Sequence, residues 1–273
     1  MKQKIPFMNS VISFETKGKG NAVVFVHGFP ESSAIWDDFA EELSKDFLVV
    51  TLDLPGHGES GMPATFAGME TFADAVHGIT SHLSLKAFTL VGHSMGGYVS
   101  LAYAKKYEHE NLLNGICLFH STVFADSDEK KINRNRAIEA VRKDKLSFIG
   151  ELIPNLFTKD NQVKHTLEIS KLKDIAKIST AETIAASLAA MRDRNDSSDF
   201  VRSTSLPFQF IIGKRDNSIP FEVNFPMTAF PKSSFTLLLD NVAHMGFIEA
   251  RNETLFALRN FLNFCSGNYK SAL

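Results

Sequence analysis

Short runs of apolar, β-branched and aromatic residues recur along the chain, separated by stretches in which apolar residues return every three or four positions. The short runs are continuous rather than alternating, which is typical of strands buried on both faces of a sheet. Strands that alternate with helices predict an α/β fold with a mostly parallel sheet. The predicted strands are 22–26, 47–52, 87–91, 115–119, 208–212 and 235–239.

Three helices are predicted between these strands, over residues 32–47, 69–83 and 95–107. In the first, Ile35, Phe39 and Leu43 lie at helical spacing, and Ser32 or Ser33 is the expected N-cap. The N-terminal segment 11–26 reads instead as a β-hairpin with its turn at "KGKG". This hairpin would add antiparallel strands at one edge of the sheet.

One long segment contains no strand-like run. From Phe124 to about Thr204 only helical patterns occur, over 128–144, 146–157, 163–175 and 179–194. The last begins with Ser179 followed by Glu182, a capping-box signature. So long a helical stretch between two core strands predicts an inserted cap. We therefore divide the chain into an α/β core, residues 1–122 and 205–273, and a helical cap, residues 123–204.

The composition of the chain limits the classes of function that it can have. The chain has 273 residues, of which 44% are hydrophobic and 22% charged, as in ordinary globular domains. Its formal net charge of −2 gives no basic field for nucleic acid or an anionic membrane. No apolar run has the roughly 18–20 residues of a membrane span, and the N-terminus does not resemble a secretory signal. Two cysteines, Cys117 and Cys265, are predicted to be packed thiols in a reducing, cytoplasmic setting.

The sequence "LVGHSMGG" at 90–97 is the first candidate for chemistry. It lies between a predicted strand and a predicted helix, the setting of a nucleophile elbow, where a serine is exposed on a strained turn. Gly92 and Gly96 would be required because a Cβ at either position would collide with a neighbouring strand or helix. Ser94 is therefore the predicted nucleophile, and its φ angle should be positive. The alternative is that Ser94 only caps the helix.

A serine nucleophile needs a base, and the base needs an acid to hold it. Asp216 follows the strand at 208–212, and His244 follows the strand at 235–239. Ligands bind beyond the carboxyl ends of strands in open α/β sheets. Asp126 is the weakest rival acid, whereas Asp53 and Asp240 are expected to brace loops. His93 is adjacent to the serine and should point away from it.

An oxyanion hole is expected from two backbone amides. Met95, directly after the serine, should supply one. Phe29, in the sharp "HGFP" turn after the first predicted strand, should supply the other.

Five ordered motifs together resemble the α/β-hydrolase superfamily with a cap domain: "VHGFPESSAIW", "LDLPGHGES", "LVGHSMGG", "GKRDNSIP" and "NVAHMGF". The resemblance implies an eight-stranded sheet flanked by helices. "HGFPESS" is similar to epoxide hydrolases and haloalkane dehalogenases, but those use an aspartate where this chain has Ser94. With a serine at this position, the chain resembles small-molecule esterases, lactonases, C–C bond hydrolases and the cofactor-independent synthase of the menaquinone pathway.

The sequence thus predicts a serine hydrolase that cleaves a small, largely apolar carboxylic ester through Ser94, His244, Asp216 and an acyl-enzyme. No metal or organic cofactor is implied, nor any nucleic-acid or membrane partner. A C–C bond hydrolase or lyase with the same triad, and a ligand-sensing receptor with slow turnover, remain alternatives because they share the fold. The residues expected to shape the pocket are His120, Phe124, Phe148, Leu152, Phe157 and Met191.

Overall fold

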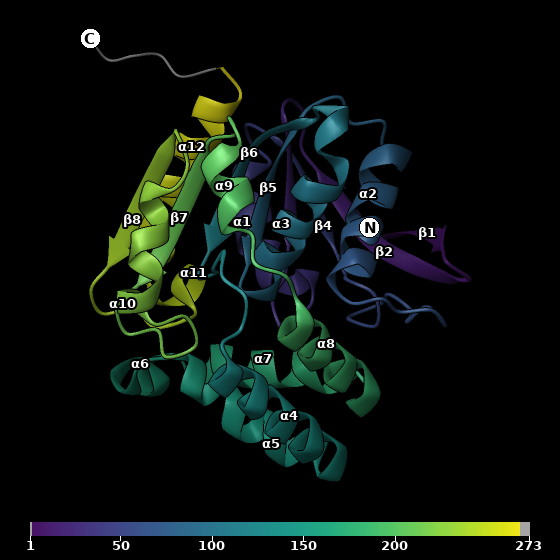
Figure 1. Cartoon of the computed structure of the whole chain (residues 1–273), viewed down its shortest axis with the longest axis vertical. Coiled ribbons are helices and arrows are strands. Elements are labelled where there is room, and N and C mark those ends of the chain that lie inside the picture. Colours follow the sequence, from purple (N-terminus) through teal and green to yellow (C-terminus); the bar gives the residue numbers. More distant parts are fainter. Residues whose placement is uncertain (1, 268–273) are drawn as a thin grey trace.

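The centre of the molecule is an eight-stranded sheet with the order β1-β2-β4-β3-β5-β6-β7-β8 (Figure 1). The structure, a computed structural model, describes residues 2–267, so the outermost residues of the predicted core range lie outside it. The strands are β1 (Gln3–Phe7), β2 (Ser10–Lys17), β3 (Ala22–Val26), β4 (Leu48–Leu52), β5 (Phe88–His93), β6 (Leu113–Phe119), β7 (Phe208–Gly213) and β8 (Ser234–Leu239). All six predicted strands are confirmed, with ends that differ by one or two residues.

The sheet is mostly parallel, as predicted. Strands β4, β3, β5, β6, β7 and β8 run in one direction, so their carboxyl ends share one edge. All residues of β3, β5 and β7 are buried, which explains why apolar residues predominate in these strands.

The predicted hairpin over 11–26 is wrong. Strand β2 pairs antiparallel with β1 and with β4, and it does not pair with β3. The true hairpin joins β1 to β2 through Met8 and Asn9, which both have positive φ. Both sides of β3 are occupied by parallel partners, β4 and β5, so it has no edge left for β2. The antiparallel strands do lie at one edge of the sheet, as expected.

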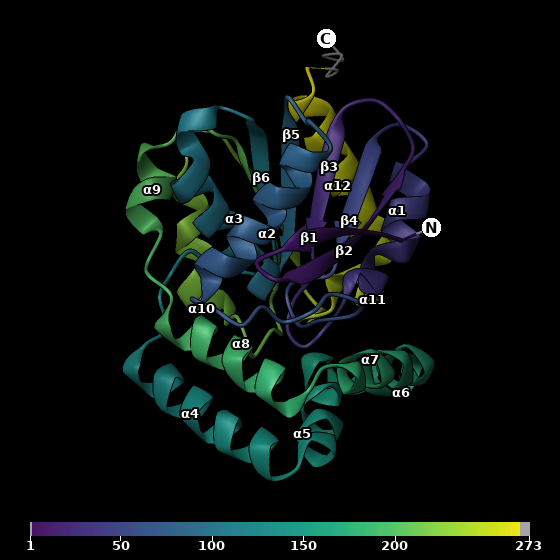
Figure 2. The ribbon, with the colours of Figure 1, turned by 90° about the vertical axis from the view of Figure 1, so that its right-hand side faces the viewer.

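Helices cover both faces of the sheet. Figure 2 shows α2 (Met69–His82), α3 (Met95–Tyr107) and α9 (Ser198–Ser203) on one side, and α1 (Asp37–Leu43) and α12 (Arg251–Cys265) on the other. The first predicted helix begins as a short 3₁₀ turn, Ser33–Trp36, and Ser32 is its N-cap because its side chain accepts a hydrogen bond from the Ala34 amide. Shorter helices are η2 (Glu108–Glu110), α10 (Phe221–Asn224), η4 (Phe225–Ala229) and α11 (Gly246–Glu249).

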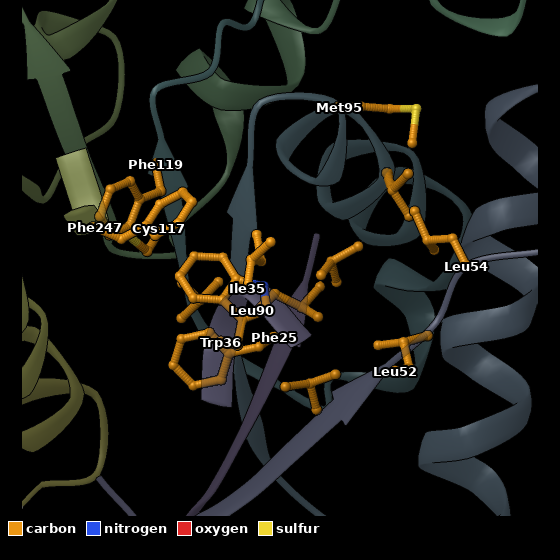
Figure 3. Packing of buried hydrophobic residues seen from close by; sticks show 14 of the residues in the cluster. Phe25, Ile35, Trp36, Leu52, Leu54, Leu90, Met95, Cys117, Phe119 and Phe247 are labelled. Atoms are coloured by element: carbon orange, nitrogen blue, oxygen red, sulfur yellow. The ribbon is translucent and has the colours of Figure 1, made fainter. Parts of the chain in front are cut away.

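The core beneath the carboxyl edge of the sheet is aromatic. Trp36 is fully buried, and its ring centroid lies 4.9 Å from that of Phe25, 5.7 Å from Phe119 and 5.5 Å from Phe247. Figure 3 shows these rings grouped around the ends of the central strands. Tilted and edge-on ring pairs of this kind add to the free energy gained by burial. They give the loops above them a rigid base.

Five helices lie beyond the carboxyl edge of the sheet, all from the segment predicted to be the cap (Figure 1). They are α4 (Asp128–Lys143), α5 (Lys145–Leu152), α6 (Lys159–Lys164), α7 (Thr166–Ile178) and α8 (Ala181–Asp193), with a 3₁₀ turn η3 (Pro154–Leu156). Helix α4 packs along α8, and α5 packs on α7. One hydrophobic cluster continues from the sheet into these helices, so they are seated on the core rather than tethered to it.

Two details differ from the predicted cap. The N-cap of α8 is Thr180, whose side chain accepts from the Thr183 amide, whereas the Ser179 hydroxyl donates to the Gly56 carbonyl. Helix α9 lies inside the range 123–204, yet its Val201 packs in the cluster of β6, β7 and α3. The boundaries of the cap remain our prediction, and we propose that α4–α8 form its body.

Both cysteines are free thiols, with Cys117 buried and Cys265 half-buried. Among residues 2–267, no helix combines the length and apolar character needed to cross a membrane.

Candidate active site

Ser94 lies between the end of β5 and the start of α3, on a turn with φ 50° and ψ −113°. The predicted positive φ is confirmed. A Cβ at Gly92 would overlap the backbone of Gly96, and one at Gly96 would overlap the carbonyl of Val26. The turn can therefore form only with glycine at both positions, as the sequence predicted. The strain of a positive φ is stored at a half-buried serine that lines a cavity.

Asp216 and His244 are brought together from loops that follow β7 and β8. His244 Nδ1 donates to Asp216 Oδ2 over 2.7 Å. Asp216 Oδ1 accepts from the amides of Ser218 and Ile219 at 2.8 and 2.9 Å. Asp216 is 4% exposed, so these bonds replace the water that its carboxylate has lost. The arrangement fixes the histidine with Nε2 left for a reacting group.

The electrostatics favour an ionised aspartate. Burial, the largest influence, raises the pKa of Asp216, but the charge of His244 and its hydrogen bond hold that pKa well below the ordinary range. His120 faces the same carboxylate, with Nδ1 3.4 Å from Asp216 Oδ2 and no well-formed hydrogen bond. Burial lowers the pKa of His120 to about 4, so its ring is neutral at physiological pH.

His120, Asp216 and His244 also form the one metal-like cluster among the described residues, with candidate ligand atoms within 4.8 Å of one another. All three are buried, and the 2.7 Å bond between His244 and Asp216 leaves no room for an ion between those two atoms. The cluster therefore fits an acid–base pair with a neighbouring histidine better than a metal centre.

The two expected amide donors lie in the loops around Ser94. Met95 opens helix α3, where the first amides have no intrahelical acceptor. Within the described part of the chain, the Phe29 amide donates to no protein group. Ser94 Oγ and His244 share no hydrogen bond among the described residues, and such a bond often tightens only when substrate binds.

A buried pair behind the site escaped the sequence analysis. Glu31 Oε2 accepts from His93 Nδ1 at 3.0 Å and from the Gly28 amide at 2.7 Å, and His93 Nε2 lies 3.0 Å from the His244 carbonyl oxygen. A carboxylate oxygen and a carbonyl oxygen face the two nitrogens of the His93 ring, an arrangement that favours a proton on each nitrogen and a cationic ring. Burial, the largest influence, opposes charge on both side chains. Their mutual attraction nevertheless lowers the pKa of Glu31 and raises that of His93.

A cavity of about 270 Å³ contains Ser94 and His244. Of the residues predicted to shape the pocket, Phe148, Leu152 and Met191 line it, and Leu156 and Leu188 add further apolar wall. Sequence reasoning missed its polar lining, above all Lys130 and Arg134 of α4. Their spacing of four positions on a predicted helix was the available signal, because it places both on one face.

The other three predicted pocket residues are not among those that line this cavity. His120 is buried beside Asp216. The Phe124 ring packs edge-on against Phe230, at 5.9 Å between centroids. Phe157 lines a neighbouring cavity of about 920 Å³, which shares Leu152, Leu156, Asn217 and Ser218 with the first.

Comparison with known proteins places this geometry in a family. Residues 21–135 match the family model of the alpha/beta hydrolase fold. A thermophilic esterase from Thermogutta terrifontis, solved with malate bound, is 32% identical, covers 97% of this chain and 99% of its own, and has a TM-score of 0.90. A pimeloyl-[acyl-carrier protein] methyl ester esterase of Aliivibrio fischeri is 24% identical over 94% of this chain and 99% of its own length.

Some curated relatives match only in part. The similarity to an uncharacterised protein of Mycobacterium bovis, 31% identical, spans 39% of this chain and 30% of that protein. The match with the Thermogutta esterase, in contrast, runs through both chains nearly from end to end. With its eight-stranded sheet, its strained serine turn and this full-length likeness, the chain belongs to the α/β-hydrolase superfamily.

Proposed function

We propose that this protein is a serine hydrolase that cleaves a small, largely apolar carboxylic ester. One observation carries the proposal: Ser94, on its strained turn, lines the same cavity as His244, whose Nδ1 is bonded to Asp216. The names of the Thermogutta and Aliivibrio relatives support an ester as the substrate class.

The reaction begins when Ser94 Oγ attacks the ester carbonyl carbon and His244 Nε2 takes its proton. The carbonyl π electrons move to oxygen, and the amides of Phe29 and Met95 bind the resulting oxyanion. When the tetrahedral intermediate collapses, the C–O bond to the alcohol breaks and His244 protonates the leaving oxygen. Water then attacks the acyl-Ser94 ester by the same steps, and the acid leaves.

Asp216 stays ionised throughout. Its bond to Nδ1 keeps the proton of His244 on that nitrogen, which leaves Nε2 as the base. The same negative charge stabilises the imidazolium that forms when His244 takes the serine proton. The low pKa of Asp216 supports this role, because a protonated acid would provide no such charge.

The cavity supports a small substrate. Phe148, Leu152, Met191 and the other apolar residues of its wall would bury a short chain, at about 0.8 kcal/mol for each CH₂. Helices of the cap supply that wall, so the cap is expected to select the substrate and the sheet edge to supply the chemistry.

The test is turnover of p-nitrophenyl esters with acyl chains of two to eight carbons, by wild type and by Ser94→Ala. We expect multiple turnover by the wild type, and labelling by a fluorophosphonate that the variant lacks. Ser203→Ala, on the exposed side of α9, is the matched control and should behave as wild type. One turnover with a lasting adduct would favour a ligand sensor. Failure on every ester combined with cleavage of a β-diketone would favour C–C bond hydrolysis.

A further inference from the structure

The wall of the cavity that holds Ser94 carries two cationic side chains and no carboxylate among the described residues that line it. Lys130 and Arg134 both project from α4 of the cap. Most of the remaining wall is aliphatic or aromatic. In a largely apolar enclosure, a positive charge interacts more strongly with a bound anion than it does in water.

The charges near these two side chains do not cancel. Among residues 2–267, Asp126 is the one carboxylate that binds Arg134, through Nε at 3.1 Å, and it also binds Arg194 at 2.7 Å. Lys130 forms no ion pair with any described residue, and its Nζ donates to the Ser218 carbonyl at 3.2 Å. Three cations, Lys130, Arg134 and Arg194, therefore lie near two carboxylates, because the charges of Asp126 and Asp216 both act on Lys130. The positive charge at the cavity wall is only partly neutralised.

Lys130 and Arg134 also keep N–H groups that can donate hydrogen bonds to a ligand. Arg134 uses Nε for Asp126, and its two terminal nitrogens bind no described protein group. A guanidinium edge of this kind fits a carboxylate, and an ammonium with one bond to a carbonyl has two further protons to donate. Burial, the largest influence, and the charges of Arg134 and Arg194 lower the pKa of Lys130, and the charges of Asp126 and Asp216 offset this only in part. A bound anion would add to the stabilisation of the ammonium form.

We propose that Lys130 and Arg134 form a carboxylate subsite, so that the preferred ester bears a carboxylate a few carbons from its scissile carbonyl. The inference rests on the proposed esterase function and refines its substrate class. The apolar walls hold the carbon chain, and the cations hold its charged end. A neutral ester of the same length lacks the second contact.

The test compares esters matched in length and different in charge. p-Nitrophenyl glutarate, with a free carboxylate, is compared with p-nitrophenyl pentanoate. The butyryl ester of 4-hydroxybenzoate, compared with that of 4-methylphenol, places the charge on the alcohol side instead. The readout is the ratio of kcat/KM for the anionic ester to that for its neutral partner. Wild type should favour the anion in at least one pair.

Lys130→Gln should lower that ratio roughly tenfold to hundredfold, the factor expected for one hydrogen bond to a charged group. Arg134→Gln should act in the same direction, and Arg134→Lys should restore part of the loss. Lys131→Gln and Arg136→Gln remove the same charges from exposed positions of α4 and are the matched controls. They should change the ratio less than twofold. Arg134→Gln also breaks the pair with Asp126, so Lys130→Gln decides the matter if that variant does not fold.

Calorimetric binding of glutarate provides a readout that needs no turnover. Its Kd should rise about tenfold or more in Lys130→Gln and stay unchanged in Lys131→Gln. The carboxylate subsite would be overturned, and the esterase kept, if the protein turned over neutral esters but Lys130→Gln and Lys131→Gln did not differ. In that case the two variants would have the same ratio of kcat/KM for the anionic and neutral esters and the same Kd for glutarate. Glutarate binding that depends on Lys130, in a protein that cleaves no ester, would overturn the esterase and keep the subsite.

Discussion

Glu31→Gln tests whether the buried pair behind the site is an ion pair that holds three segments together. Glu31 is 2% exposed and His93 is 1% exposed. Through them the loop at Gly28, the residue before Ser94 and the carbonyl of His244 are joined. Glutamine keeps the size of the side chain and removes its charge. The imidazolium of His93 would then be buried without a counter-ion.

Breaking a buried pair by removing one partner costs about 3–5 kcal/mol, because the remaining charge is left uncompensated. In a protein of this size, 1 kcal/mol shifts Tm by about 2–4 °C. We therefore expect Glu31→Gln to lower Tm by roughly 6–20 °C at pH 5.5. His93→Gln should cost a similar amount, and the double variant should lose less than the sum because the two side chains interact directly.

The loss should also depend on pH. The folded pKa of Glu31 is below its ordinary value of 4.5, so its contribution to stability is present above pH 4.5 and lost as pH falls through the folded pKa. The folded pKa of His93 is above its ordinary value of 6.5, so its contribution is full below pH 6.5 and lost as pH rises through the folded pKa. The difference between wild type and Glu31→Gln should thus be largest between pH 4.5 and 6.5.

Thermal and urea unfolding at pH 5.5 and at pH 9, by circular dichroism, measure both effects. Glu139→Gln, at an exposed position of α4, removes the same charge and should change Tm by less than about 2 °C. If Glu31→Gln changes Tm no more than this control does, Glu31 and His93 do not form a stabilising ion pair. An equal loss at both pH values would show that the pair contributes packing or neutral hydrogen bonds rather than charge.

The remaining predictions concern catalysis. Ser94→Ala should lower kcat by roughly 10³-fold or more with little change in substrate affinity, and a variant that keeps a tenth of kcat would contradict the nucleophile assignment. Asp216→Asn should cost about 10⁴ in kcat, as for the acid of serine proteases, whereas Asp126→Asn should chiefly lower Tm because it frees Arg134 and Arg194. For neutral esters, kcat/KM should rise from acetyl to butyryl or hexanoyl and then fall. Activity that still climbs at sixteen carbons would mean that the chain extends beyond the 270 Å³ cavity.

The fold was predictable where the signal is local. Strands such as Ala22–Val26 and Phe208–Gly213 are buried along their whole length, and most of their residues are therefore apolar. The pairing of the strands depends on contacts between distant segments and leaves no local pattern in the sequence. For this reason the predicted hairpin over 11–26 is wrong. Segment 11–17 has the residues of a strand, but its pairing with β4 is decided by β3 already having two parallel partners.

The same distinction between local patterns and distant contacts applies to the candidate site. Ser94, Asp216 and His244 each follow a strand, so chain order and glycine spacing were enough to nominate them. Glu31 and His93 both lie in motifs that the sequence singled out, but neither motif indicates that the two side chains meet each other and the His244 carbonyl. The cavity lining depends on how α4, α5 and α8 lie across the sheet edge, which explains why Phe124 and Phe157 were nominated and Lys130 was not.

The contacts of His244 bear on whether the cap can open widely. The His244 amide donates to the carbonyl of Leu156, which belongs to the cap, while the His244 carbonyl lies against His93 in the core. Glu249 ties the same loop to the cap, because it accepts from the amides of Ala243 and Thr158 at 3.0 and 3.2 Å. A wide swing of the cap would break these bonds and displace the base from Asp216. We therefore expect the proposed cap to stay in place while His244 is aligned with Asp216, and long acyl chains to be excluded from the competent site.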